Sequence, residues 1–390
     1  MILDIEPMED LFMNILVLGN GFDLAHGLPT TYKDFLDFTH IFKYYYEEEN
    51  KKQYIFSEKY QKYKPYILKL FQESMNSEDK KNLIQELAEL IINNRWLEYF
   101  WQVNRSGGWI DFESEISNVI QALDRVRKCR NEQIKKEPQA QTFTPDKYDS
   151  TLLNKLDLGI GKMDIRLVEN IKEFLLDDLN KLIKCLEIYL DDYVGQIIPQ
   201  VVLPDIIELK IHCVLSFNYT DTYQKFYHTD ENIDYDYIHG KINTGSSVES
   251  CQLILGIDEY LTGEDKRRDN EYIQFKKFYQ RIYKTTGCKY VDWIRKVNEV
   301  ARMTPKMQGP INNVYILGHS LDVTDGDIIS GLINMPNTKT TIFHHSQEAL
   351  GNQICNLVKI LGEEELIEKV HGQNASIILK EQKAPVGIEK

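Results

Sequence analysis

Residues 14–38 read NILVLGNGFDLAHGLPTTYKDFLDF, and this stretch decides how the rest of the chain is interpreted. The apolar run that ends at Gly19 is typical of a buried parallel strand. Thr31 and Asp34 then resemble a capping box at the start of a helix. Glycines between a strand and a helix let the backbone approach an anion such as phosphate. The stretch therefore predicts an α/β fold with a ligand beyond its first strand.

Strand patterns return in the second half of the chain. Because most of these stretches alternate with helical patterns, they predict a mostly parallel, Rossmann-like sheet with helices on both faces. The six stretches are 210–220, 234–240, 251–257, 312–320, 338–346 and 375–380.

Helical periodicity dominates the region between the first strand and these later strands. Apolar residues recur there at helical spacing, while residues 130–163 are polar and predict a loop. We therefore expect residues 41–202 to form a large helical insertion. The predicted α/β core comprises residues 13–40 and 203–390, and residues 1–12 are expected to be a leader.

Composition restricts the class of protein. The 390 residues carry a net charge of −14, which disfavours non-specific binding to nucleic acid or to an anionic membrane. No apolar run approaches the roughly 20 residues of a spanning helix, and the acidic N-terminus lacks the basic region of a secretory signal. Six cysteines without a CxxC pair favour neither a zinc site nor a disulfide framework. We expect a cytoplasmic protein without a bound metal.

Unusual residues follow four of the predicted strands. GNGFD, FNYT, HG and GHSLD each begin near a strand end. Ligands of open parallel sheets bind beyond the carboxyl ends of the strands, so these segments predict one shared pocket. Leu24 stands where a dinucleotide fingerprint requires its last glycine, which disfavours an ordinary dehydrogenase.

The order of these segments resembles that of the sirtuins. GNGFDLAHGLP is similar to the sirtuin GAG(I/F)S…GIP segment, with Asp23 in place of serine, and GHSLDV is similar to GTSLxV. SFNYT places Asn218 on the sirtuin asparagine, and IHG places His239 on the catalytic histidine. The resemblance implies a sirtuin-like nucleotide pocket. Its binding residues would be Gly19, Asn20, Gly21, Phe22, Asp23, Gly318, His319 and Ser320.

A second resemblance covers nearly the whole chain beyond residue 13. LGNGFDLAHGLPTTYKDFL, WIDFE, FNYT, IHG, ILGI and GHSLD together resemble the AbiH family of bacterial abortive-infection proteins. This resemblance implies a role in phage defence, and the sirtuin-like segments imply hydrolysis of NAD at the nicotinamide–ribose bond. In that reaction Asn218 would orient the ribose or a water, and His239 would be the general base. His26 and Glu113 are further candidates for the pocket.

Structural roles compete with these assignments. Asp23 and Asn218 could cap helices, His239 could be a partly buried histidine, and Ser320 could start a turn. Asp111 is expected to cap the helix that carries Glu113. The acids Asp322, Asp325 and Asp327 could suggest a cation site, but their spacing favours capping.

Two functions from other classes remain open. The chain could sense a nucleotide without turnover and act through a partner, or it could be a nuclease, although its acidic balance disfavours the latter. The expected partners are NAD or a related nucleotide, a phage-derived trigger or defence partner, and further copies of the chain.

Overall fold

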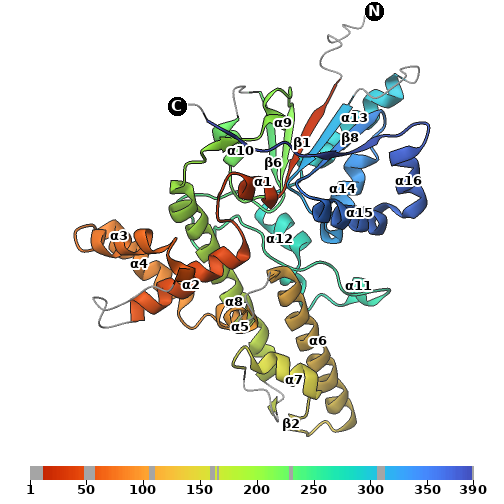
Figure 1. Cartoon of the computed structure of the whole chain (residues 1–390). Helices are drawn as coiled ribbons and strands as arrows, with labels where there is room; N and C mark the ends of the chain where they lie inside the picture. The colour runs from red at the N-terminus through yellow and green to blue at the C-terminus, as the bar shows by residue number, and fades with distance from the viewer. Residues whose placement is uncertain are drawn as a thin grey trace, which may run out of the picture. The chain divides into compact units, whose positions relative to one another are not determined.

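The protein is described here by a computed structural model. It describes residues 12–47, 58–104, 110–158, 163–164, 167–227, 232–304 and 312–388. Residues 1–11 of the expected leader lie outside these ranges. The chain divides into two compact units, shown in Figure 1. Unit 1 comprises residues 1–29, 197–242 and 284–390, and unit 2 comprises residues 30–196 and 243–283.

Unit 1 is built on a six-stranded sheet in the order β6-β5-β1-β7-β8-β9. Every neighbouring pair in this sheet is parallel, which confirms the predicted α/β class with a mainly parallel sheet. The strands of unit 1 are β1 (Asn14–Leu18), β4 (Val201–Val202), β5 (Cys213–Ser216), β6 (Asp234–Tyr237), β7 (Asn312–Leu317), β8 (Thr338–His344), β9 (Ile377–Glu381) and β10 (Val386–Gly387).

Side chains of successive strand residues enter two separate cores, one on each face of this sheet. Ile15 and Val17 of β1 pack in one core with residues of α13–α16, whereas Leu16 and Leu18 pack in the other with residues of α1, α9 and α10. The helices are α1 (Asn20–Ala25), α9 (Pro204–Ile207), α10 (Thr222–Phe226), α13 (Lys289–Met303), α14 (Gly326–Ile333), α15 (Gln347–Leu361) and α16 (Glu363–His371), with a 3₁₀ turn η8 (Val323–Asp325).

Unit 2 is mainly helical. The predicted capping box starts α2, because Asp34 N donates to Thr31 Oγ1 (3.0 Å) and Thr31 N donates to Asp34 Oδ2 (3.3 Å). Its helices are α2 (Tyr32–Glu47), α3 (Lys64–Glu73), α4 (Glu78–Ile91), α5 (Arg95–Val103), α6 (Phe112–Lys136), α7 (Lys147–Asn154), α8 (Leu167–Ile188), α11 (Asp265–Arg268) and α12 (Lys277–Lys284). A π-helical turn (Tyr189–Tyr193), 3₁₀ turns (Glu58–Tyr60, Val194–Gln196, Ile273–Phe275) and the strands β2 (Thr142–Phe143) and β3 (Met163–Asp164) complete it.

Stacked aromatic rings form much of the interior of unit 2. Phe112 lies between Tyr32 and Phe100, with ring centroids 4.3 and 4.1 Å away. A buried ion pair lies on α8, where Lys184 Nζ is 2.9 Å from Glu187 Oε2. Glu187 Oε1 also accepts a hydrogen bond from Asn243 N (3.1 Å), so this pair holds the loop that follows residue 242 within unit 2.

Two predicted elements differ from the structure. Residues 251–257 form no strand; this buried segment makes a single bridge, between Ile257 and Lys276, and both residues belong to unit 2. The polar residues 130–163 are not one loop, because α6 continues to Lys136 and Asp146 caps α7 by accepting from Tyr148 N.

Candidate functional site

Four strands of unit 1 end at the same edge of the sheet. Leu18 at the end of β1 pairs with Ser216 of β5 and Leu317 of β7, and Ser216 pairs in turn with Tyr237 of β6. The residues that follow these strands therefore leave the sheet side by side. This carboxyl edge is where open parallel sheets bind their ligands.

The glycines at this edge pack against one another. A Cβ on Gly19 would lie 2.6 Å from Gly318 O, and one on Gly21 would lie 2.8 Å from the same oxygen. Gly318 itself has φ +71°, and its Cβ would lie 2.2 Å from Phe22 N. These three glycines are needed because the turn after β1 and the turn after β7 touch through their backbones.

The backbone amides of this turn are already hydrogen-bonded inside the protein. Gly19 N donates to Leu317 O (3.1 Å), Gly21 N donates to Gly318 O (2.8 Å), and Phe22 N donates to Gly19 O (2.9 Å). These three amide donors are therefore already used within the protein, and pyrophosphate binding by Gly19 and Gly21 stays a prediction. The turn of Gly318 packs against both glycines.

Asn218 is fixed at the start of the loop after β5. Its Nδ2 donates to Gly19 O (3.1 Å), and its backbone N donates to Ser216 Oγ (3.1 Å). Asn218 is not a helix cap, because α10 begins four residues later with Asp221 as its N-cap residue. Within the described part of the chain, the buried Oδ1 of Asn218 has no hydrogen-bond partner.

Asp23 lies on α1, beside Asn218. Thr220 Oγ1 donates to Asp23 Oδ2 at 2.6 Å, and Oδ1 has no partner among the described residues. The side chain is 1% exposed. Burial raises the pKa of Asp23 from 3.8 to about 6, although the hydroxyl groups of Thr220 and Thr222 lower it. The pKa of the Asp23 carboxyl group therefore lies well above that of an ordinary aspartate.

A small cavity of about 10 Å³ lies between these side chains. A cavity of this size is at the lower limit of what can hold one water molecule. Asp23 and Asn218 both line it, whereas His239, His319 and Ser320 do not. The full lining is Leu18, Phe22, Asp23, Val214, Ser216, Asn218, Thr220, Thr222, Tyr223, Tyr235 and Tyr237.

His239 belongs to a second buried group at the same edge. Its Nε2 is 3.8 Å from Asp325 Oδ1, and His319 Nε2 is 3.5 Å from Asp325 Oδ2. His239 Nδ1 lies 3.2 Å from Phe217 O, a contact that requires a proton on Nδ1. In the neutral ring, Nε2 is therefore the basic nitrogen, and Asp325 would stabilise the imidazolium once Nε2 is protonated.

The tautomer of His319 is fixed in the opposite sense. Its Nδ1 accepts a hydrogen bond from Leu321 N (2.9 Å), so the proton of the neutral ring lies on Nε2, toward Asp325. The spacing of Asp322, Asp325 and Asp327 did not distinguish Asp325 from its neighbours. Asp322 caps η8 by accepting from Thr324 N (3.0 Å), as predicted, whereas Asp325 is buried between two imidazoles.

Other predicted site residues have different surroundings. Asn20 and Ser320 are exposed. His26 is buried with both ring nitrogens 2.7 Å from an oxygen, Nδ1 from Phe22 O and Nε2 from Tyr227 OH. Burial lowers the pKa of His26, so this ring is a neutral structural contact.

Glu113 lies in unit 2. Asp111 caps α6 as predicted, because its Oδ1 accepts from Glu113 N at 3.0 Å. The Glu113 carboxylate pairs with the buried Lys277, with Oε2 at 2.5 Å from Nζ.

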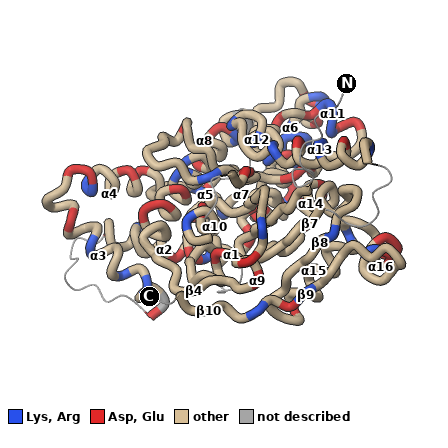
Figure 2. Tube along the Cα trace, turned by 90° about the horizontal axis from the view of Figure 1, so that it is seen from above, with Lys and Arg blue, Asp and Glu red and all other residues tan. Residues whose placement is uncertain are grey.

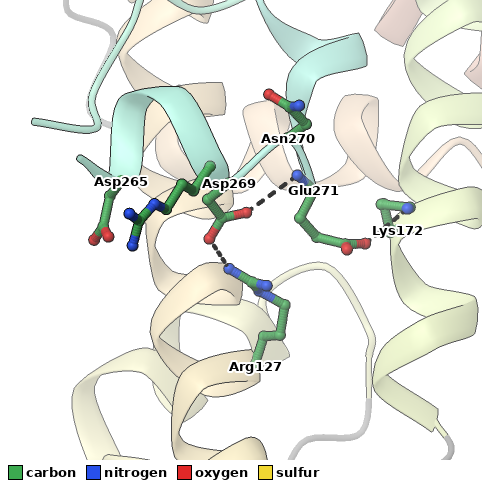
Figure 3. Close-up of a pocket in the computed structure, with 7 residues that line it drawn as sticks. Arg127, Lys172, Asp265, Asp269, Asn270 and Glu271 are labelled. Carbon is green, nitrogen blue, oxygen red and sulfur yellow. Dashed lines mark hydrogen bonds and ion pairs between the residues drawn. The ribbon is translucent and has the colours of Figure 1, made fainter.

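A polar cavity of about 620 Å³ opens on unit 2, shown in Figure 3. Its charges pair with one another: Lys172 contacts Glu271 at 2.7 Å, and Arg127 contacts Asp269. Because acids and bases neutralise one another there, the cavity favours neither an anion nor a cation. It is lined by Arg127, Lys172, Asp265, Arg268, Asp269, Asn270 and Glu271.

The described residues hold neither a metal-ligating cluster nor a membrane-spanning helix. They contain no group of three or more His, Cys, Asp or Glu side chains placed to hold a metal ion. In the same part of the chain, every helix is too short or too polar to span a bilayer. Figure 2 shows basic positions of α4 and α16 beside acidic ones on the same helices.

Comparison with known proteins gives one match. A family described as "Bacteriophage abortive infection AbiH" matches residues 15–345, a range that includes the edge with Asp23, Asn218 and His239. Neither the curated proteins nor the solved structures contain a match. The match covers most of the 390 residues and confirms the resemblance seen in the sequence. The chain belongs to the AbiH family of bacteriophage abortive infection proteins.

Proposed function

We propose that the chain acts in abortive infection by hydrolysing NAD at the bond between nicotinamide and ribose. The reaction would take place at the carboxyl edge of unit 1 and would deplete the NAD of an infected cell. Control by a phage-derived trigger, by a defence partner or by assembly of several copies belongs to the same proposal, since such an activity in the cytoplasm must be suppressed before infection.

The observation that supports this chemistry most directly is the tautomer of His239, which is fixed by a hydrogen bond. A hydrogen bond from Nδ1 to Phe217 O leaves Nε2 as the basic nitrogen, and the carboxylate of Asp325 lies 3.8 Å from it. A histidine held in this way can accept a proton from a ribose hydroxyl and remain stabilised as a cation. A positioned general base of this kind contributes roughly 10²–10⁴-fold to a rate.

Asn218 supplies the second polar group at this edge. It follows β5, the strand next to the one that His239 follows, and its amide is held by Gly19 O. Cleavage of the nicotinamide–ribose bond resembles other glycosidic cleavages in passing through a cationic sugar, which an amide oxygen can stabilise or supply with water. Nicotinamide leaves as a neutral molecule, so no acid is needed for the leaving group.

The proposal concerns the sugar end of NAD, because the backbone amides of Gly19, Gly21 and Phe22 already donate hydrogen bonds within the protein. We do not assign the pyrophosphate to this turn. His319 contributes through Asp325, whose Oδ2 it approaches while His239 approaches Oδ1.

The test measures nicotinamide and ADP-ribose released from NAD by the purified chain. Asn218→Ala and His239→Ala should each lower the rate at least about 100-fold. His345→Ala is the matched control, since His345 is exposed and lies on the same unit. NAD should also be measured in cells that express each variant, before and after phage infection, so that activity that depends on a trigger is detected.

Three results would contradict NAD hydrolysis or its assignment to Asn218 and His239. Binding of NAD without nicotinamide release, in the tube and in infected cells, would favour a nucleotide sensor. Degradation of DNA or RNA that His239→Ala leaves unchanged would favour a nuclease. Full NAD cleavage by both the Asn218 and the His239 variants would place the reaction elsewhere in the chain.

A further inference from the structure

We propose that Asp23 accepts the proton of the attacking water, which it holds together with Asn218 in the small cavity at the carboxyl edge. This role rests on the NAD hydrolysis proposed above. It adds a catalytic carboxyl group that neither the family match nor the sequence patterns assign.

Asp23 and Asn218 each have one buried oxygen that could accept a further hydrogen bond. Asp23 is 1% exposed and Asn218 is 6% exposed. Asp23 Oδ1 and Asn218 Oδ1 are both buried acceptors without a partner among the described residues, and both side chains line the same cavity. An unsatisfied buried acceptor destabilises a fold. One water molecule in a cavity of about 10 Å³ would satisfy both, since it has two hydrogens to donate.

The surrounding contacts fix which atoms face this water. Asn218 Nδ2 donates to Gly19 O, so exchanging the amide nitrogen and oxygen would place two acceptors against each other. Thr220 donates to Asp23 Oδ2 and leaves Oδ1 for the water. Both acceptors are thus oriented before any substrate binds, which is how positioned groups contribute to a reaction rate.

The charged and titratable groups around Asp23 keep its carboxyl suited to this role. Burial is the main reason that its pKa is raised to about 6, and the nearby Asp221 raises it further. Asp221 is itself paired with Lys225 and Lys241, at 2.8 and 3.1 Å. From β6, Tyr237 faces the same cavity and stays neutral, because burial raises its pKa. A carboxylate with a pKa near 6 is a stronger base than an ordinary one and is ionised at neutral pH.

The chemical step balances without a further reactant. The oxygen of the water forms a bond to C1′ of the ribose while the bond from C1′ to the nicotinamide nitrogen breaks. Nicotinamide leaves with the electron pair of that bond. The proton of the water moves to Asp23 Oδ1 and later to solvent. The ADP-ribose product carries the oxygen of the water at C1′.

The experiment compares wild type with Asp23→Asn and Thr220→Val. NAD is supplied in water labelled with oxygen-18, and nicotinamide release and label at C1′ are measured from pH 5 to pH 9. Asp23→Asn should lower the rate at least about 100-fold. Asp322→Asn is the control and should stay within about twofold of wild type, because Asp322 is exposed and asparagine also caps.

Thr220→Val provides a readout that a structural role of Asp23 would not change. The Thr220 hydroxyl lowers the pKa of Asp23, so its loss should move the acidic limb of the rate profile to higher pH. The rate at pH 9 should stay near that of wild type. If Asp23→Asn does not fold, the position of this limb decides the question alone.

The outcomes separate the two proposals. Cleavage of NAD by Asp23→Asn at the wild-type rate would overturn the role of Asp23 and leave NAD hydrolysis intact. An acidic limb that Thr220→Val does not move would have the same meaning. Absence of NAD cleavage by wild type, both purified and in infected cells, would overturn the proposed function and the role of Asp23 with it.

Discussion

Replacing Asp23 by Asn should stabilise the protein at neutral and alkaline pH while it removes activity. The carboxylate is buried, and its Oδ1 has no partner in the described part of the chain. Asparagine has nearly the same size but no charge. Its oxygen can accept from Thr220, and its nitrogen can donate toward the cavity that Asn218 Oδ1 also faces.

The size of the effect follows from the pKa of Asp23. Burial raises this pKa from 3.8 to about 6, and each tenfold change in proton affinity corresponds to about 1.4 kcal/mol, which gives about 3 kcal/mol. The folded protein binds this proton more tightly than the unfolded chain, so ionisation destabilises the fold. This penalty is absent below pH 3.8, grows through the interval between the two values, and is complete above about pH 6.

The assay is thermal unfolding of wild type, Asp23→Asn and the control Asp322→Asn between pH 4 and pH 8. The melting temperature of Asp23→Asn should exceed that of wild type by roughly 6–12 °C at pH 8. The difference should shrink toward zero near pH 4. A difference that is equal at every pH would refute the reasoning, because it would show that Asp23 does not ionise at a raised pKa.

Two further pairs of variants test close packing and a buried charge by urea unfolding. Gly318→Ala should destabilise unit 1 by about 2–5 kcal/mol, since its Cβ would meet backbone at 2.2 Å, whereas Gly27→Ala, with φ +74° but open space around it, should lose only about 1–2 kcal/mol; equal losses would contradict the packing argument. Lys184→Met leaves Glu187 buried without its cation and should lose about 3–5 kcal/mol, whereas Lys181→Met, which breaks an exposed pair, should lose at most about 1 kcal/mol. A Lys184 variant as stable as the Lys181 variant would show that the buried pair contributes little.

The parallel sheet was predictable because its strands are short apolar runs that end at glycine or polar residues. The same signal failed at residues 251–257, where an equally apolar run is buried in unit 2 with only the bridge from Ile257 to Lys276. A buried strand and a buried segment outside a sheet have the same apolar composition, because burial determines that composition and strand pairing does not change it. The order of the strands in the sheet could not be predicted from the sequence either, since β1 pairs with strands that lie far away along the chain.

The residues of the candidate site were easier to find than their roles. Strand ends pointed to Asn218, His239 and the glycines, and the structure does bring those ends to one edge. Spacing could not show that Gly19 and Gly21 pack on Gly318, because the contact is made between turns nearly 300 residues apart. It also could not distinguish the buried Asp325 from its exposed neighbours, since acids near the start of a helix usually cap it.

The position of β1 in the middle of the sheet affects how the protein is made. Asn14 pairs with Asn313, a separation of 299 residues. A ribosome that adds about 5–20 residues per second needs roughly 15–60 s to pass from one to the other. During that time the first strand has an unfilled side, which makes it a target for chaperones. The turn after β7 is synthesised last among the four that meet at the edge, so this edge cannot assemble before the ribosome has passed residue 318.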